Sequence, residues 1–230
     1  MRSVLFINGN DPKALLNSTL YGADALAYDL HDAVDAANKD AARLLLQEAL
    51  AFFDFGQARV FVRINPMSEC GAEDIAVAGK GRPQAFILPQ ADAACVREAD
   101  TAIAALEAEN GFAAGSIKLI PVAESALAIA NTAELLASCP RIIAAVFNAR
   151  GFLKDMGAPD AGASEQVLYA RSRLAVACRV AGIPAIDGAF LQAKDADGLT
   201  ADAARARSLG FSGKVAVSGN QVPVINEIFA

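Results

Sequence analysis

The sequence predicts an α/β protein whose eight parallel strands close into a (β/α)8 barrel, or TIM barrel, formed by a single domain over residues 1–230. Three observations predict this class. Short apolar runs recur along the chain, and Ala-rich stretches with apolar residues at helical spacing separate them. The runs are apolar on both faces, which is typical of buried parallel strands joined by right-handed crossovers. They number close to eight, which favours a closed barrel; an open doubly wound sheet is the alternative if one strand is missed or false.

The expected strands are short, and several end at a proline or a polar turn. In chain order they cover residues 4–7, 24–29, 60–64, 85–88, 117–120, 142–147, 185–187 and 214–217. Pro66 and Pro89 follow the third and fourth strands. The clearest expected helices cover residues 39–53, 91–109, 125–136 and 164–181. Gly111 and Gly182 follow two of these helices and are natural C-terminal stops.

The composition favours a folded protein with a large core, because 54% of the residues are hydrophobic and 20% are charged. The formal net charge is −6, whereas a nucleic-acid-binding surface needs a cationic face to release counterions from phosphates. No apolar run is long enough to cross a bilayer, and Met1 leads directly into the first strand rather than into a signal peptide. We therefore expect a cytoplasmic protein without membrane or nucleic-acid partners, in which a few local cations can still bind a small anion.

The four cysteines, Cys70, Cys95, Cys139 and Cys178, include no C-x-x-C pair, and the chain has one histidine. A zinc site built from Cys and His is therefore not expected. We interpret Cys139 and Cys178, which lie among apolar residues, as small core residues with reduced thiols.

Motifs along nearly the whole chain are similar, in the same order, to those of one known family. They are R-S-V-L-F-I-N-G-N at residues 2–10, G-A-D-A at 22–25, D-L-H-D-A-V at 29–34, V-R-I-N-P at 62–66, L-Y-A-R-S-R at 168–173, G-I-P-A-I-D at 182–187 and L-G-F-S-G-K at 209–214. This set resembles the citrate lyase β-subunit group of the HpcH/HpaI aldolase family. The resemblance implies a carbon–carbon lyase acting on a hydroxyacyl-CoA thioester or a keto acid, and assembly as a homo-oligomer. It also implies an active site at the C-terminal ends of the strands, where Mg²⁺ held by two carboxylates stabilises an enolate together with an arginine.

Two residues match family positions at strand ends. Arg63 ends the third strand, and the resemblance makes it the expected catalytic and substrate-binding arginine, because a planar guanidinium suits a carboxylate or a keto oxygen. The alternative for Arg63 is a salt bridge to a neighbouring loop. Glu124 falls on the position of a family metal ligand after the fifth strand. It is equally consistent with an ordinary acid in the first turn of the next helix, since a single carboxylate holds a divalent ion poorly.

The sequence departs from the family pattern after the sixth strand. The family has F-G-A-E-D-L there, and its aspartate is the second metal ligand, whereas this chain has F-N-A-R-G-F at residues 147–152. Gly151 replaces the metal-ligating aspartate, and Arg150 replaces the acid before it. By Coulomb's law this exchange opposes Mg²⁺ binding and favours an anion, so Arg150 is a candidate substrate-binding residue. The alternative is that Arg150 pairs with Glu124.

The second-strand motif supplies further candidates at the barrel mouth. Asp29 and Asp32 keep the acidic pair of the family and are candidate substrate-binding residues, although both can instead brace loops by accepting backbone N–H groups. His31 stands where the family has glutamate and can act as an acid or base, or as a structural hydrogen-bonding group. Asp187, after the seventh strand, has the same two alternatives as the acidic pair. Gln90 replaces a family lysine.

Two functions from different classes are consistent with these residues. The first is a citrate lyase β-subunit-like lyase that acts on a hydroxyacyl-CoA thioester or a keto acid, with impaired metal-dependent activity. The second is a catalytically degenerate barrel that binds a small anionic molecule or a partner protein. Family members usually continue beyond the eighth strand with further helices, and we expect this chain to lack that C-terminal extension, which would leave the mouth wetter.

Overall fold

The computed structural model describes residues 1–159 and 165–230 and shows one closed barrel of eight strands in sequence order, which confirms the predicted fold class. The strands are β1 Ser3–Asn8, β2 Ala25–Asp29, β3 Arg59–Arg63, β4 Ala85–Leu88, β5 Lys118–Ala123, β6 Ala145–Phe147, β7 Ala185–Asp187 and β8 Gly213–Ala216. Every neighbouring pair is parallel, and β1 closes the barrel by pairing with β8, where Val4 lies opposite Val215.

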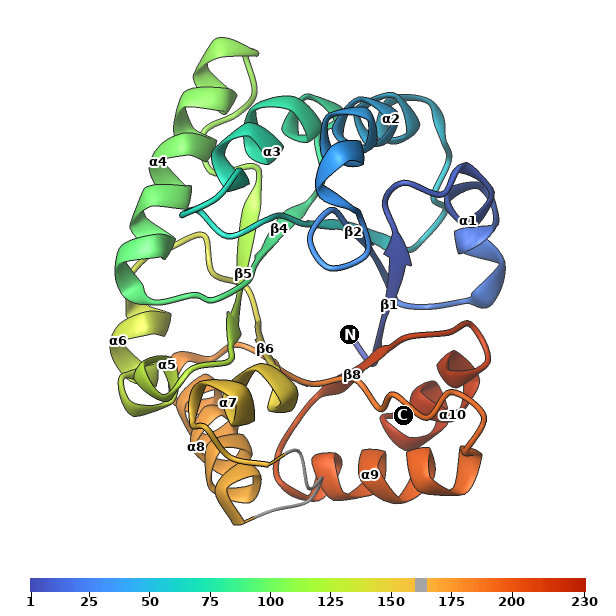
Figure 1. Cartoon of the computed structure of the whole chain (residues 1–230), viewed down its shortest axis with the longest axis vertical. Coiled ribbons are helices and arrows are strands. Elements are labelled where there is room, and N and C mark those ends of the chain that lie inside the picture. The colour runs from blue at the N-terminus through green and yellow to red at the C-terminus, as the bar shows by residue number, and fades with distance from the viewer. Residues whose placement is uncertain (160–164) are drawn as a thin grey trace.

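A ring of helices surrounds the strands, as Figure 1 shows. The α-helices are α1 Pro12–Asn17, α2 Lys39–Phe52, α3 Gly71–Ala78, α4 Ala93–Glu109, α5 Ala126–Ala130, α6 Thr132–Ala137, α7 Ala149–Asp155, α8 Glu165–Ala181, α9 Ala196–Ser208 and α10 Gln221–Ile228. Short 3-10 helices occur at η1 Ser18–Tyr21, η2 Ala36–Asn38 and η3 Gly79–Gly81. None of the helices in the described ranges has the length and apolar character needed to span a membrane.

Several elements differ from the sequence-based expectation; β6, for example, begins at Ala145 rather than at residue 142. The helix expected over residues 125–136 is divided at Asn131, which ends α5 and begins α6 with φ −109° and ψ 31°. Asparagine competes with the helical backbone for hydrogen bonds, so a break at this residue is physically reasonable. Strand β5 was expected to end before Pro121, but Val122 and Ala123 continue the ladder opposite Val146 and Phe147. This continuation carries the chain to Glu124 at the barrel mouth.

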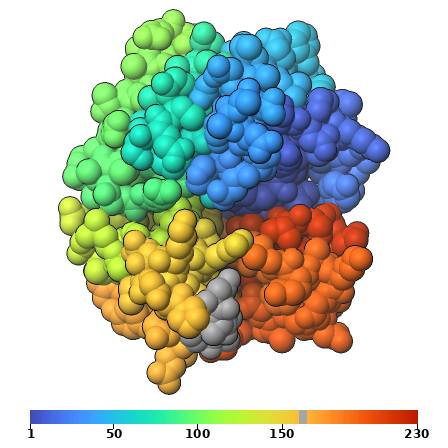
Figure 2. Space-filling view, in the orientation of Figure 1, coloured from blue at the N-terminus to red at the C-terminus, as the bar shows by residue number. Residues whose placement is uncertain are grey.

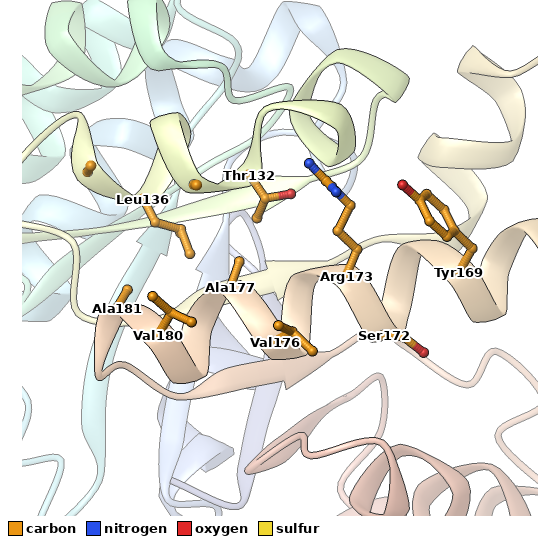
Figure 3. Close-up of a pocket in the computed structure, with 11 residues that line it drawn as sticks. Thr132, Leu136, Tyr169, Ser172, Arg173, Val176, Ala177, Val180 and Ala181 are labelled. Atoms are coloured by element: carbon orange, nitrogen blue, oxygen red, sulfur yellow. The ribbon is translucent and has the colours of Figure 1, made fainter.

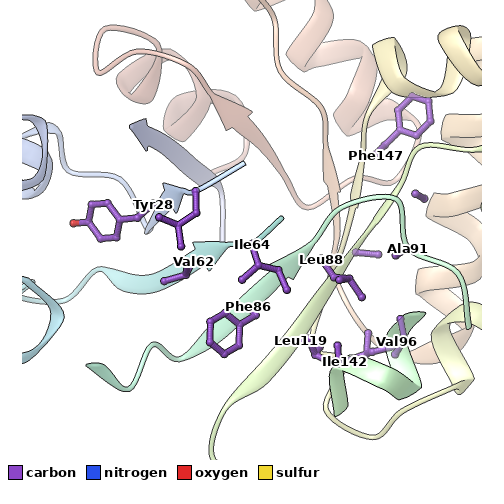
Figure 4. Close-up of a cluster of buried hydrophobic side chains, with 14 of the residues drawn as sticks. Tyr28, Val62, Ile64, Phe86, Leu88, Ala91, Val96, Leu119, Ile142 and Phe147 are labelled. Atoms are coloured by element: carbon purple, nitrogen blue, oxygen red, sulfur yellow. The ribbon is translucent and has the colours of Figure 1, made fainter. Parts of the chain in front are cut away.

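Alternation along the strands produces two separate apolar cores. Inside the barrel, small and branched side chains such as Ala25, Ala27 and Val122 pack around Phe61. The larger core lies between the barrel and the helices; some of its members, including Tyr28, Phe86 and Leu119, are shown in Figure 4. Burying one such large side chain contributes about 1.5–3 kcal/mol. In the space-filling view, parts of the chain far apart in sequence meet near the middle of the molecule (Figure 2).

A buried charge cluster ties the N-terminal ends of β5 and β6 to α4. Arg141, which precedes β6, donates from Nη1 and Nη2 to the two carboxylate oxygens of Glu107, each at 2.8 Å, and from Nε to Asp100 at 2.5 Å. Glu107 also accepts the backbone N–H groups of Gly115 and Ile117. Burial alone would raise the pKa of Glu107, but these donors lower it to about 2.

Candidate active site

Arg63 lies at the C-terminal end of β3, beside Asp29 at the end of β2. Its Nη1 donates to Asp29 Oδ2 at 3.1 Å and to Asp32 Oδ2 at 2.7 Å. The guanidinium carbon lies 5.9 Å from the centre of the Phe6 ring. Burial opposes its charge, but the two carboxylates outweigh burial and raise the pKa of Arg63. The salt bridge considered as an alternative role is therefore present.

The pairing uses only part of the Arg63 guanidinium. Nε and Nη2 donate to no residue within 1–159 and 165–230. Neither nitrogen belongs to the side-chain atoms of those residues that are both buried from solvent and without a hydrogen-bond partner. These two nitrogens share the edge of the guanidinium that binds carboxylates in bidentate geometry. The Arg63 side chain is therefore held in place while its binding edge stays open.

The loop after β2 is ordered by the two aspartates that the sequence singled out. Asp29 Oδ1 accepts the backbone N–H of His31 at 2.8 Å, which confirms a loop-bracing role. Burial opposes ionisation of Asp32, but the Arg63 charge and hydrogen bond outweigh it, so its pKa lies below the usual range. Nδ1 of His31 lies 3.4 Å from Asp32 Oδ1, is buried, and has no hydrogen-bond partner among the described residues. This nitrogen is therefore shielded from solvent and faces the carboxylate of Asp32.

Sequence reasoning missed a second set of groups that support this loop. Lys39 donates from Nζ to the carbonyl oxygens of Leu30 and His31, at 3.0 Å each, and to the side chain of Asn65. Asn65 in turn donates through its backbone and side-chain N–H groups to the fully buried carboxylate of Asp74. Asn65 belongs to the V-R-I-N-P motif, which is the one sequence signal for this set of groups. Its partners Lys39 and Asp74 lie too far away in sequence for the contacts to be predicted.

Glu124 lies directly after β5, two strands along the barrel from Arg63, and its charge helps to raise the pKa of that arginine. Both of its carboxylate oxygens accept hydrogen bonds. Oε1 accepts the backbone N–H of Gln90 at 2.6 Å, and Oε2 accepts the side-chain amide of Asn148. Gln90 has φ +48°, a left-handed conformation that is unfavourable for residues other than glycine. The backbone at Gln90 is therefore held in a strained conformation that directs its N–H at Glu124.

Gly151 lies against this carboxylate in the first turn of α7. A Cβ atom added at Gly151 would lie 2.6 Å from Glu124 Oε2 and 2.9 Å from Glu124 Cβ. Any side chain here would therefore force Glu124 to move. Arg150 is exposed and does not pair with Glu124, so the interpretation of Arg150 as the partner of Glu124 is wrong; the amide groups of Gln90 and Asn148 take that place.

The residues of the mouth do not fit the Mg²⁺ site that the family resemblance implies. Glu124 has both oxygens bonded to amides, and Asp29 and Asp32 are bonded to Arg63. No cluster of three or more His, Cys, Asp or Glu side chains in the described ranges has an arrangement that could hold a metal ion. A divalent ion needs several free oxygen ligands, and among these three carboxylates only Asp32 Oδ1 accepts no hydrogen bond from the described residues.

Asp187 was considered for the mouth but belongs to a buried network behind the barrel wall. Its Oδ2 accepts from Arg171 Nη2 at 2.7 Å and from Lys214 Nζ at 2.6 Å, and both cations also pair with Asp202. Asp187 therefore accepts from two cationic side chains rather than from the backbone N–H groups that the loop-bracing alternative expected. Cys178 is buried, as expected, and burial raises the pKa of its thiol to about 12.

Comparison with known proteins places this geometry in a family. A model of the HpcH/HpaI aldolase/citrate lyase family matches residues 2–219. The citrate lyase subunit beta of Leuconostoc mesenteroides subsp. cremoris is 32% identical over 100% of this chain and 76% of its own length. A (3S)-malyl-CoA thioesterase of Cereibacter sphaeroides is 31% identical over 100% of this chain and 77% of its own length. The solved structure of protein CitE from Mycobacterium tuberculosis in complex with magnesium and pyruvate has a TM-score of 0.83 and 25% identity, over 99% of this chain and 90% of that one. With its eight-stranded barrel and the arginine at the end of β3, the chain belongs to the HpcH/HpaI aldolase/citrate lyase family.

Proposed function

We propose that the barrel mouth binds a small carboxylic or keto acid, free or carried on CoA, through the open edge of Arg63, with little Mg²⁺-dependent carbon–carbon cleavage. The observation that carries this proposal is the partial pairing of the guanidinium. Nη1 is held by Asp29 and Asp32, while Nε and Nη2 have no acceptor within residues 1–159 and 165–230. Substrates of this class are consistent with the relatives, which include a malyl-CoA thioesterase.

The two aspartates orient Arg63 rather than neutralise its binding edge. Because they hold Nη1, a ligand carboxylate meets a guanidinium that is already in position, which reduces the entropy lost on binding. The Arg63 side chain is 9% exposed, so hydrogen bonds at this edge form in a medium of low dielectric and are stronger than in water. His31, whose side chain is 17% exposed beside Asp32, is the second group that we propose contacts the ligand.

Arg150 extends the proposed site at the rim. It occupies an exposed position in the first turn of α7, where the family pattern has an acid. An exposed cation contributes mainly by attracting an anionic ligand over a distance of about one Debye length. We therefore propose that Arg150 attracts the ligand as it approaches and that Arg63 forms hydrogen bonds with the bound ligand.

The proposed loss of metal-dependent cleavage follows from the carboxylates. Enolate formation needs positive charge or hydrogen-bond donors at the developing oxyanion. At this mouth the amide groups of Gln90 and Asn148 occupy Glu124, and Gly151 offers no ligand. Arg63 alone would have to stabilise the oxyanion, with its charge already offset by two aspartates.

Calorimetry with pyruvate and oxaloacetate as probes tests the binding proposal. Arg63→Lys keeps the charge but removes the bidentate edge, so we expect affinity to fall by about ten- to a hundredfold, the equivalent of one charge-assisted hydrogen bond. Arg59→Lys is the matched control, because Arg59 lies on the same strand at the opposite, exposed end. Equal affinities for wild type and Arg63→Lys would rule out binding at this edge.

A Mg²⁺-dependent lyase is the second candidate, and one observation favours it. The Asp32 side chain is 67% exposed and could leave Arg63 at little cost to bind an ion together with Glu124. Stoichiometric Mg²⁺ binding by the wild type, accompanied by cleavage of a malyl-CoA or citryl-CoA thioester, would establish this candidate. The variant Arg150→Glu with Gly151→Asp restores the family acids, and a gain of Mg²⁺ affinity only in that variant would support the first proposal.

Location and assembly are also inferred from the family likeness. We propose that the protein is cytoplasmic and forms a homo-oligomer, without nucleic-acid or membrane partners. Sedimentation velocity of the purified chain, with and without added DNA or lipid vesicles, tests the assembly and the partners, and fractionation of cells tests the location.

A further inference from the structure

Helix α8 has apolar side chains on two of its faces. One face, which includes Val167, Leu174 and Cys178, is buried against the barrel. The other face points outward and carries Tyr169, Val176 and Val180, whose exposed fractions are 60%, 65% and 85%. A helix that is apolar on both sides is expected to be covered on both sides.

The outward face borders a groove between α8 and α6. The groove has a volume of about 790 Å³, and its walls include Thr132 and Leu136 of α6 and Tyr169, Val176 and Val180 of α8 (Figure 3). It lies on the outer side of the helix ring and shares no residue with the mouth around Arg63 and Glu124. Among the described elements, α8 also carries the largest number of exposed large apolar side chains.

The spacing of this face suits another helix. Residues 169, 173, 176 and 180 follow one another at intervals of four, three and four, which is the spacing of a helix-packing seam. Arg173 lies within the seam, but its guanidinium turns aside to the carbonyl oxygens of Ile129 and Ala130 at the end of α5. The positive charge of Arg173 is therefore stabilised by the C-terminal end of α5, so packing another helix over this face would not leave that charge without a partner.

The charges at the two ends of α8 identify the partner. Glu165 lies at the N-terminal end of the helix and Arg179 near the C-terminal end, and both are exposed. A second α8 packed antiparallel about a two-fold axis brings the acidic end of each helix over the basic end of the other. The same arrangement opposes the two helix dipoles favourably and places Tyr169 beside Val176 of the partner copy.

We propose that this face, defined by Tyr169, Val176 and Val180 with the adjoining groove on α6, pairs with the same face of a second copy of the chain. The α8 face forms an isologous two-fold contact, in which Glu165 of each copy pairs with Arg179 of the other. The proposal rests on the homo-oligomer proposed above and names the face that forms it. It is independent of the ligand proposed for Arg63, because the two sites share no residue.

The first test is the mass of the assembly, measured by sedimentation velocity over a dilution series. We expect the double variant Val176→Glu with Val180→Glu to halve the mass of the wild-type assembly, or to raise its dissociation constant at least about tenfold. Leu44→Glu on α2 is the matched control, since Leu44 is 57% exposed on another helix. All three substituted positions are exposed, and circular dichroism with thermal unfolding verifies that the variants fold.

The second test separates this antiparallel contact from a general apolar contact. Glu165→Arg and Arg179→Glu should each weaken association about two- to fivefold, and the doubly exchanged variant should regain the wild-type affinity. A wild type that is monomeric at every concentration would overturn the proposal, as would an α8 variant with unchanged mass. If association of the doubly exchanged variant is weakened by the sum of the two single effects, the proposed Glu165–Arg179 pairing is wrong. A monomeric protein whose α8 face binds lipid vesicles would overturn the proposed pairing as well.

Discussion

The two ends of the barrel each hold a buried arginine between two carboxylates, but they use it differently. At the N-terminal end, Arg141 donates from Nε, Nη1 and Nη2 to Glu107 and Asp100, and Nη1 also donates to a backbone carbonyl. At the C-terminal end, Arg63 donates from Nη1 alone. A guanidinium with every edge occupied can only hold structure together, whereas one with a free edge can also bind. The difference indicates which end of the barrel stabilises the fold and which is available for a ligand.

The largest expected effect is the loss of stability on removing the fully paired arginine. Arg141→Met leaves Glu107 buried at 2% exposure without its main partner, so we expect the free energy of unfolding to fall by about 3–5 kcal/mol. Arg63→Met should lower it by only about 1–3 kcal/mol, because Asp29 keeps its hydrogen bond from His31. Urea unfolding of both variants, with the exposed Arg59→Met as control, measures the contrast. Equal losses for Arg141 and Arg63 would remove the distinction between the two ends.

The next effect is acid sensitivity at the N-terminal end. The pKa of Glu107 is lowered to about 2 in the folded protein, so its ion pairs stabilise the fold above the unfolded pKa of 4.5 and are lost as pH falls from about 4.5 toward 2. The linked loss amounts to roughly 3 kcal/mol. Unfolding free energies measured between pH 7 and pH 2.5 should show this decline. Glu107→Gln should lower stability at neutral pH and flatten the profile; an unchanged profile in that variant would assign acid sensitivity to other groups.

A smaller effect is expected from filling the space beside Glu124. Gly151→Ala places a methyl group within 2.6 Å of a carboxylate oxygen, and we expect a loss of about 1–3 kcal/mol unless Glu124 moves. Ala149→Ser is the control, because it adds one atom to the same turn of α7 at a position other than Gly151. An unchanged unfolding midpoint for Gly151→Ala would mean that Glu124 is mobile and free to find other ligands.

The smallest expected effect is at Asp32, the exposed partner of Arg63. Asp32→Asn should change the free energy of unfolding by less than about 1 kcal/mol, because its side chain is 67% exposed and solvent screens the pair. The same variant should strengthen the binding of an acid at the mouth, since it removes a negative charge beside Arg63. Calorimetry with pyruvate measures this gain, and weaker binding would show that Asp32 orients Arg63 more than it opposes the ligand.

Most of the fold could be predicted from the sequence because barrel strands are short apolar runs separated by recognisable helices. The positions of Arg63 and Glu124 followed from motifs at strand ends. Their partners did not follow, because contacts at a barrel mouth join strands that are distant in sequence. Nothing local indicates that a backbone N–H at Gln90 reaches Glu124, or that Lys39 reaches Asn65. The division of one helix at Asn131 was missed because apolar spacing continues across it.

The pairing of β1 with β8 has a consequence for how the chain folds as it is synthesised. Val4 lies opposite Val215, so one edge of the first strand has no partner until some 210 residues later in the chain have been made. At about 5–20 residues per second, that edge waits roughly 10 to 40 s after translation of its own strand. An unpaired apolar strand edge is a template for aggregation during this interval. Co-expression with a holdase chaperone should therefore protect the edge of β1 from aggregation until β8 has been synthesised and pairs with it.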